Sequence, residues 1–325
     1  MSGDNLLYFE NDDKHNFEKK VISIDDNQKS KRLDIVLSSL YPDISRSRIQ
    51  NWIASGAATL DGLVSKCSTH VKLGQRLEIN PPATSENIQY EPEQIDLDIV
   101  YEDSSILVLN KQRGLVVHPG AGNWNGTLLN GLLHYCPSLI KIPRAGLVHR
   151  LDKDTSGLLV IAKTLETHAN LVVQLQKRKV NRLYTAVAWG KLRSKMKINH
   201  PLARDPYNRI KFSVSSSPYA KESQTDIKPI VYGKIDNNPL TVIECKLRTG
   251  RTHQIRVHLE FVNHPIIGDK IYKKGSPSLN KLKIQRQALH AKHLSFVHPS
   301  TNKSVEFNSS VPDDILDLFT VAAIK

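Results

Sequence analysis

Two short helices near the start of the chain are predicted by apolar residues that recur every three to four positions. Residues 32–40 place leucines and a valine on one helical face, and residues 45–56 do the same with isoleucines and a tryptophan. Ser45 is a suitable N-cap for the second helix, and Gly56 is placed to end it in a left-handed turn. The segments TLDGLV and VKLGQRLEI follow, with short apolar alternations around an Asp61-Gly62 turn, which indicates a small β-hairpin region.

Beyond residue 95 the pattern changes to longer β-type runs with a few helices between them. The runs LDIVYED, SSILVLNK and GLVVHPG are expected to be strands, and TLLNGLLHY a helix. A buried strand is expected over residues 158–162, an alternating strand over 182–190 and another strand over 290–298. The segment THQIRVHLEFV carries a helical apolar stripe, so its two histidines are expected to be packed or hydrogen-bonded rather than bound to a metal.

The chain is expected to divide into two folded parts that are joined by a linker. Residues 80–94, NPPATSENIQYEPEQ, combine three prolines with polar residues and no basic charge, which is typical of a linker. The first 28 residues are polar and acidic, without sustained periodicity. We therefore expect, in order, a mobile acidic tail at 1–28, a small domain at 29–80, a linker at 81–96 and a large domain at 97–325.

The charge of the chain favours an anionic partner. Its 325 residues include 45 Lys and Arg against 32 Asp and Glu, which gives a net charge of +13. Residues 101–325 hold 34 of the basic and 16 of the acidic side chains, so the excess lies in the large domain. Nucleic acid is the first candidate for the partner, although a basic surface can also serve only to keep a protein in solution.

Several classes of protein are disfavoured by the sequence. No window approaches the roughly 18 uninterrupted apolar residues of a membrane helix, and the N-terminus lacks a signal pattern, so we expect a cytoplasmic protein. Three widely spaced cysteines, Cys67, Cys136 and Cys245, argue against disulfides and against a structural zinc site. The glycine-rich turn at 120–126 has the wrong spacing for a dinucleotide loop, so no Rossmann cofactor is expected.

The segment RAGLVHRLDKDTSGLLVIAKT carries the most informative cluster of polar residues. An apolar start leads into His-Arg-Leu-Asp and a polar turn, and then into a buried strand. If the loop is extended, Arg150 and Asp152 point to the same side of it. On the residues alone, Asp152 could be a turn or capping carboxylate, or it could hold a divalent metal together with Asp154, although two carboxylates are few for such a site.

HRLDKDTSGLLVIAK resembles the active-site signature of the RluA family of RNA pseudouridine synthases. RLYTAVAWG at 182–190 and LRTGRTHQIRVHLEFVNHPIIGD at 247–269 agree with two further motifs of this family, in the same order. The stretch from KRLDIVLSSLYP to VKLGQRLEI resembles the RNA-binding domain first seen in small-subunit ribosomal protein S-four. The resemblance implies an α+β catalytic domain with a bent mixed, largely antiparallel sheet, preceded by a small α+β RNA-binding domain.

The resemblance also assigns roles to five residues. Asp152 takes the place of the essential aspartate of the family, and Arg251 is expected to form a salt bridge with it. Tyr184 is expected to line the base pocket and to assist proton removal from carbon 5 of the uracil, and Ile255 to close that pocket. Arg150 is expected to fill the place that a flipped uridine leaves in its stack. Taken alone, Arg251 could be a phosphate contact and Tyr184 an ordinary core tyrosine.

Five further basic residues are candidate RNA contacts. Arg46 and Arg48 fall in the first turn of a predicted helix, where cations oppose the helix dipole, so their presence suggests phosphate contact. Arg204, Arg209 and Lys211 belong to a segment rich in basic and turn-forming residues, which in the family reaches around an RNA stem-loop. Each of these residues could equally be a solvated surface charge.

The function implied by the resemblance is isomerisation of uridine to pseudouridine in large-subunit (23S) ribosomal RNA, with the helix 69 stem-loop as the target. This reaction has no net redox change, so no cofactor and no metal are expected. The expected partner is large-subunit ribosomal RNA or a precursor particle of the large subunit, and we expect a monomer with no membrane attachment. The alternatives are a related synthase that acts on other 23S uridines, a non-catalytic RNA-binding ribosome assembly factor, and a metal-dependent RNA nuclease.

Overall fold

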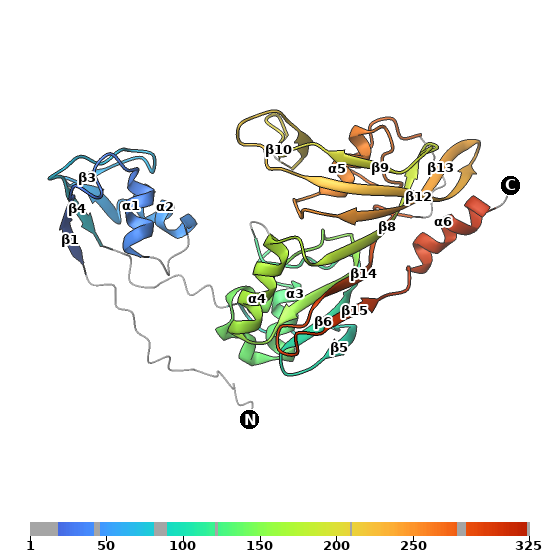
Figure 1. Ribbon diagram of the computed structural model, residues 1–325, viewed down its shortest axis with the longest axis horizontal. Helices are drawn as coiled ribbons and strands as arrows, with labels where there is room; N and C mark the ends of the chain where they lie inside the picture. The colour runs from blue at the N-terminus through green and yellow to red at the C-terminus, as the bar shows by residue number, and fades with distance from the viewer. Residues whose placement is uncertain are drawn as a thin grey trace, which may run out of the picture. The chain divides into compact units, whose positions relative to one another are not determined.

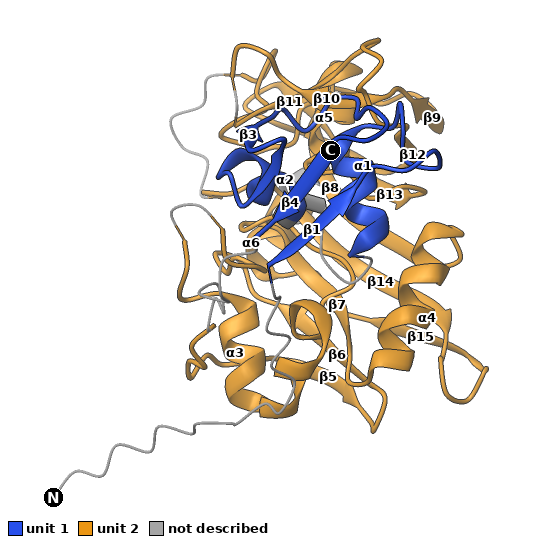
Figure 2. Ribbon diagram, turned by 90° about the vertical axis from the view of Figure 1, so that its left-hand side faces the viewer, with its two compact units in different colours: residues 1–89 blue, residues 90–325 orange. Residues whose placement is uncertain are grey.

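The computed structural model divides the chain into two compact units, residues 1–89 and residues 90–325 (Figures 1 and 2). The structure describes residues 19–41, 46–80, 90–120, 123–208, 210–277 and 284–323. Each unit has a hydrophobic core of its own. None of the helices among the described residues has the length and apolar character that a membrane span requires.

The N-terminal unit is an antiparallel sheet with two helices packed on it. Its strands, in the order β1-β4-β2-β3, are β1 (Lys20–Ser23), β4 (Arg76–Ile79), β2 (Ala58–Leu60) and β3 (Leu63–Val64). The helices α1 (Leu33–Leu40) and α2 (Arg46–Ala54) bury their apolar faces in the core of the unit, which confirms both predicted helices. The predicted turn is also confirmed, because Asp61 and Gly62 both have the positive φ that a two-residue hairpin of this type requires.

The predicted tail and the predicted linker both include residues that the structure places in the folded units. Strand β1 pairs with β4 inside the segment that was predicted to be a tail, and Ile24 is buried. The prediction therefore fails for residues 20–24, and residues 1–18 lie outside the described part of the chain. At the linker, Ile95 and Leu97 pack on the core of the C-terminal unit, and the Asn130 side chain donates a hydrogen bond to the carbonyl oxygen of Glu91 at 2.8 Å. Residues 90–96 thus belong to that unit, and residues 81–89 are not described.

The C-terminal unit is built on a nine-stranded mixed sheet. Eight strands follow the order β5-β6-β7-β14-β8-β13-β12-β9, and β15 pairs with β14. Their bounds are β5 (Ile99–Glu102), β6 (Ile106–Lys111), β7 (Ser156–Ala162), β8 (Asn181–Trp189), β9 (Met196–Asn199), β12 (Gln224–Ile235), β13 (Asn238–Leu247), β14 (Leu289–Val297) and β15 (Ser304–Asn308). Among the described strand pairs only β7 with β14 is parallel, so the prediction of a mixed, largely antiparallel sheet in an α+β fold is confirmed.

Among the described residues, four α-helices and two short 3-10 helices, Pro137–Lys141 and Pro143–Gly146, accompany this sheet, and a small hairpin is separate from it. The α-helices are α3 (Leu128–Tyr135), α4 (Leu165–Gln176), α5 (Gln254–Phe261) and α6 (Asp313–Ala323), and the hairpin is β10 (Leu202–Arg204) with β11 (Phe212–Val214). The run GLVVHPG, expected to be a strand, instead makes a loop in which Val116 forms an isolated bridge to Thr127. Gly114, Pro119 and Gly120 bound this run closely, which leaves it too short for a regular ladder.

The order of the strands brings three distant segments together. Strand β7 begins at Ser156 opposite His290 of β14, and Tyr184 of β8 lies opposite Ala291 of the same strand. Strand β13 ends beside the start of β8, where Lys246 is opposite Leu183. The loop before β7, the first residues of β8 and the segment between β13 and α5 therefore meet in space.

Gly157 makes the contact between β7 and β14 possible. It has a φ of +119°, and a Cβ atom at this position would overlap the backbone of Ala291. We expect Gly157→Ala to lower the free energy of unfolding by about 2–4 kcal/mol, because both the backbone strain and the overlap must be relieved. Gly114→Ala is the matched control: its φ is +81° but its Cβ would meet no atom within 4 Å, so it should cost only about 1–2 kcal/mol. Urea denaturation of the two variants measures the difference, and equal losses would contradict this role of Gly157.

Candidate active site

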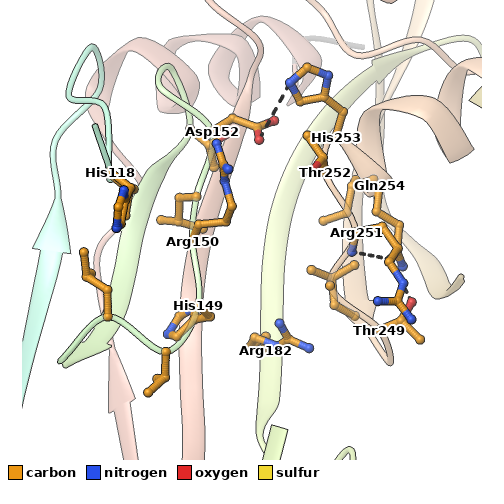
Figure 3. Close-up of a pocket in the computed structure, with 18 of the residues that line it drawn as sticks. His118, His149, Arg150, Asp152, Arg182, Thr249, Arg251, Thr252, His253 and Gln254 are labelled. Carbon is orange, nitrogen blue, oxygen red and sulfur yellow. Dashed lines mark hydrogen bonds and ion pairs between the residues drawn. The ribbon is translucent and has the colours of Figure 1, made fainter. Parts of the chain in front are cut away.

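A cleft with a volume of about 940 Å³ opens where the three segments meet. Its walls come from residues 116–120, from residues 144–155, from the start of β8 and from residues 247–256 (Figure 3). The cleft brings together five of the predicted site residues, namely Arg150, Asp152, Tyr184, Arg251 and Ile255.

Two of the other five predicted residues, Arg204 and Lys211, are not among the residues that line the cleft. Arg204 is the last residue of β10, and Lys211 lies just before β11. The guanidinium of Arg204 lies 5.2 Å from the ring centre of Phe212. The ammonium of Lys211 lies 6.0 Å from the ring centre of Tyr272. Arg209 and the side chains of Arg46 and Arg48 lie outside the part of the chain that the structure describes.

The counter-ion of Asp152 is Arg256. Its Nη1 donates to Oδ2 of Asp152 at 3.0 Å, and the Asp152 side chain remains 17% exposed to the cleft. The prediction that Arg251 forms this salt bridge is wrong. Arg251 is exposed just before α5, where its Nε donates to the carbonyl oxygen of Glu222 at 3.1 Å. Helix α5 begins only at Gln254, so it is Arg256 that the buried face of the helix turns toward Asp152.

Arg256 is itself held by a second carboxylate. Its Nε and Nη2 donate to the two oxygens of Asp269 at 2.7 and 2.9 Å, and the side chains of Arg256 and Asp269 are 5% and 0% exposed. Burial by itself would lower the pKa of Arg256, but the hydrogen bonds and charges of Asp269 and Asp152 raise it overall. The guanidinium also lies 4.9 Å from the ring centre of Tyr272. Arg256 is therefore a fixed and permanently charged group under Asp152.

The sequence held a signal for Arg256 that was missed. In QIRVHLEF the arginine stands among the buried residues Ile255, Val257 and Leu259 on a short helix. Arginine is rarely buried unless an anion pairs with it. An arginine within an apolar helical stripe therefore predicts a buried partner carboxylate, whereas Arg251 lies before the stripe begins.

His253 faces the other oxygen of Asp152. Its Nε2 lies 4.0 Å from Oδ1 of Asp152, and its Nδ1 lies 2.9 Å from the hydroxyl oxygen of Tyr272 (Figure 3). Burial lowers the pKa of His253, although the charge of Asp152 acts against this shift. His258 is hydrogen-bonded as expected, to the Thr225 hydroxyl at 2.8 Å and to the His200 carbonyl oxygen at 3.0 Å.

Tyr184 is buried beside the charged groups of the cleft. It is 4% exposed on β8, and burial raises its pKa to about 12, with the charges of Arg182 and Asp152 acting in opposite directions. Its hydroxyl therefore keeps its proton at neutral pH. Ile255 is also buried in the cleft wall, while Arg150 is exposed.

Lys111 is a second residue that the sequence did not reveal. It is buried at the end of β6, and its Nζ donates to the carbonyl oxygens of Gln112, Leu115 and Lys153 at 2.8, 2.9 and 2.9 Å. Burial lowers the pKa of Lys111 to about 7, against the opposing charges of Asp154 and Asp152. These bonds attach the loop that carries Asp152 to the loop after β6.

Among the described residues, no group of three or more His, Cys, Asp or Glu side chains is arranged to hold a metal ion. Asp152 uses Oδ2 for Arg256 and turns Oδ1 toward His253. The arrangement suits a carboxylate that acts directly on a substrate in the cleft, with a fixed cation beneath it.

The chain is similar to known proteins over most of its length. A family model described as RNA pseudouridylate synthase matches residues 105–261. The ribosomal large subunit pseudouridine synthase D of Neisseria meningitidis is 46% identical over 305 residues, which cover 90% of this chain and 79% of that protein. The proteins of the same name from Salmonella typhimurium and Escherichia coli strain K12 are 43% and 41% identical, and the matches cover 91% and 92% of this chain and 92% and 93% of theirs.

Two solved human structures share the fold. Human RNA pseudouridylate synthase domain containing 1 aligns with a TM-score of 0.54 at 26% identity, over 67% of this chain and 84% of that one. Human RNA pseudouridylate synthase domain containing 4 aligns with a TM-score of 0.54 at 22% identity, over 69% of this chain and 92% of that one.

The two arginines should differ sharply in their effect on stability. Arg256→Met leaves the buried carboxylate of Asp269 without its cation, so the free energy of unfolding should fall by about 3–5 kcal/mol. Arg251→Met removes an exposed side chain and should change it by no more than about 0.5 kcal/mol. Guanidinium chloride denaturation compares the variants with the wild type, and similar losses in both would refute the assignment of the buried pair to Arg256.

Proposed function

The chain belongs to the RluA family of RNA pseudouridine synthases, and we propose that it isomerises uridine in 23S ribosomal RNA with Asp152 as the catalytic carboxylate. The observation that carries the proposal is the position of Asp152, held by Arg256 in a cleft that Tyr184 also lines. The names of the relatives, large-subunit synthases, support 23S RNA as the substrate. Helix 69 is the stem-loop that we propose as the target.

Asp152 acts on the ribose of the target nucleotide. The reaction breaks the bond between N1 of uracil and C1′ of ribose, turns the base and rejoins it through C5. A carboxylate can attack C1′ or remove the proton of C2′, and both routes need it ionised and close to the sugar. Arg256 supplies the positive charge under the carboxylate and fixes its orientation, because all three of its nitrogen donors are engaged.

The target uridine reaches Asp152 by leaving its stack. Flipping a base costs a few kcal/mol of stacking, and a planar cation can fill the vacated place. Arg150 is exposed at the cleft and two residues from Asp152, which suits this role. Tyr184 and Ile255 supply the apolar walls for the uracil. Because the pKa of Tyr184 is about 12, its hydroxyl stays protonated, and we assign it to stacking on the uracil more than to unaided proton removal.

RNA outside the cleft meets the basic residues of both units. We assign the N-terminal unit to the S-four type of RNA-binding domain, with Arg46 and Arg48 as phosphate contacts. Arg204, Arg209 and Lys211, in the segment of the β10–β11 hairpin, contact the phosphates of the stem-loop. Because Arg256 is the residue that pairs with Asp152, we assign Arg251 to a phosphate contact at the edge of the cleft. The protein acts as a monomer in the cytoplasm, on the free RNA or on a precursor particle of the large subunit.

Asp152→Asn should abolish isomerisation. Tritium at C5 of uridine is released to water when C5 bonds to C1′, so large-subunit RNA labelled at C5 reports the reaction directly. The wild type should release tritium in the presence of EDTA, and the variant should be slower by at least about 10⁴-fold because the amide can neither attack nor accept a proton. Release by Asp152→Asn at the wild-type rate would reject the role of Asp152. Mapping the modified uridines then separates helix 69 from other 23S targets.

Arg251→Gln should weaken RNA binding without stopping the chemistry. Loss of one phosphate contact should reduce the slope of log Kd against log salt by about 1, while the single-turnover rate at saturating enzyme stays within about threefold. Filter binding over a range of salt concentrations and single-turnover tritium release measure the two quantities. An unchanged slope together with a large loss of rate would restore a catalytic role for Arg251.

A further inference from the structure

Three buried polar atoms of residues that line the cleft have no hydrogen-bond partner among the described residues, namely Nε of Arg182, Nδ1 of His149 and Nε2 of His118. Arg182 and His149 lie at some distance from Asp152 (Figure 3), whereas His118 belongs to the loop at residues 116–120. Arg182 is only 8% exposed, and no carboxylate of the described residues pairs with it within 4 Å. Burying a guanidinium without an anion costs several kcal/mol, so an uncompensated arginine in a cleft points to a ligand that compensates it.

His149 presents a hydrogen-bond donor in the same cleft, near enough to Arg182 to feel its charge. Its Nε2 accepts a hydrogen bond from the Val160 amide at 3.1 Å, so this nitrogen carries no proton. Burial lowers the pKa of His149 to about 3, with the charge of Arg182 adding to the effect, so the ring is neutral. The single ring proton therefore sits on Nδ1, which is the nitrogen without a partner in the described part of the chain. The missing ligand group is thus a hydrogen-bond acceptor.

The backbone at Gly250 leaves space for the guanidinium of Arg182. A Cβ atom on Gly250 would come within 2.7 Å of Nη1 of Arg182, so only glycine admits the guanidinium in its present place. The guanidinium therefore lies against the segment that leads to α5, with no carboxylate of the described residues paired with it. A cation that is in place before the substrate arrives suits a preorganised binding group.

Arg182 lies next to Tyr184 in the wall of the cleft. It is two residues from Tyr184 on the same face of β8, a separation of about 6–7 Å along a strand. Tyr184 feels the charges of both Asp152 and Arg182, so it lies near both groups. If the ribose binds at Asp152 and the base packs against Tyr184, Arg182 is within reach of an edge of the base. The phosphates stay near the mouth, where Arg150 and Arg251 are exposed.

We propose that Arg182 and His149 bind the carbonyl oxygens of the flipped uracil, and that Arg182 stabilises the negative charge that the base carries after it is detached. This inference rests on the proposed function, because it takes the cleft to be the uridine pocket. The residues are specificity-determining as well, since two donors facing the base select carbonyl oxygens.

The charge follows from the balance of the reaction. When the N1–C1′ bond breaks, its electron pair leaves with the base, and the detached uracil is an anion whose charge is shared with O2 and O4. The base turns and its C5 bonds to C1′, C5 then loses its proton, and N1 takes one up, which completes the isomer. The anion exists only between the two bond changes, so a cation beside it lowers the barrier and has a smaller effect on binding of the intact uridine.

A change of base acidity tests the proposal. Short stem-loop RNAs carrying uridine or 5-fluorouridine at the target are converted at saturating enzyme, and the C5-linked nucleoside is quantified by chromatography after digestion. The fluorinated base has no C5 proton to lose, so its product keeps the fluorine and takes up water across the N1=C6 bond after the C5–C1′ bond has formed. Fluorine stabilises the base anion, so it replaces part of what Arg182 supplies. Arg182→Met should slow conversion of the uridine RNA by about 10²–10³-fold and that of the fluorinated RNA by at least tenfold less. Arg182→Lys, which keeps the charge, should recover part of the loss, and RNA affinity should stay within about threefold.

The controls distinguish stabilisation of the base anion from phosphate binding and from a structural role. Arg251→Gln, from the exposed edge of the same cleft, should affect both RNAs equally. Equal losses on both RNAs for Arg182→Met, or a loss confined to affinity, would overturn the inference and make Arg182 a phosphate or structural group. If thermal unfolding shows that Arg182→Met is not folded, the Arg182→Lys variant carries the same comparison. A wild type that converts neither RNA would instead overturn the proposed function, and this inference with it.

Discussion

The active site depends on one guanidinium that two carboxylates share. The fully buried Asp269 accepts hydrogen bonds from the Nε and Nη2 of Arg256. Asp152, which lies at the cleft, accepts a hydrogen bond from the Nη1 of Arg256. Ion pairs of this kind are poor sources of stability, because the cost of removing the charges from water offsets most of their attraction. The ion pair is better explained by its role in the reaction. Asp269 fixes the position of Arg256, and the fixed guanidinium holds the Asp152 carboxylate in one orientation toward the ribose.

The sheet brings the partners of this interaction together from distant parts of the chain. Asp152 comes from the loop before β7, Arg256 from α5 and Asp269 from the turn after that helix. The only parallel pair among the described strands, β7 with β14, places the Asp152 loop beside the start of β8, and the absence of a side chain on Gly157 permits the approach. Lys111 also fixes the loop that carries Asp152, because its Nζ donates a hydrogen bond to the carbonyl oxygen of Lys153.

The apolar periodicity of the sequence predicted which helices and strands form better than it predicted the residues at which they begin and end. The helices at 33–40 and 254–261 and the strands β7, β8 and β14 follow from apolar spacing. Strand β1 was missed because its four residues are largely exposed and show no apolar alternation. The motif identified Asp152 as a site residue, but the prediction chose the wrong arginine of GRTHQIR, because it did not use the apolar stripe in which Arg256 stands. Which arginine faces Asp152 depends on where α5 begins, and Arg182 and His149 stand out only once their surroundings among the described residues are visible in three dimensions.

The most direct test of this account is the rate of isomerisation by Asp269→Asn. Asp269 is buried and does not line the cleft, so it affects the reaction indirectly, through Arg256 and through the amides of Ile271 and Tyr272, which also donate hydrogen bonds to its Oδ1. In protein that circular dichroism shows to be folded, the account predicts a single-turnover rate at least tenfold below the wild type, with RNA affinity within about threefold. A wild-type rate from folded Asp269→Asn would show that Asp152 does not depend on a fixed Arg256, and would contradict the central claim.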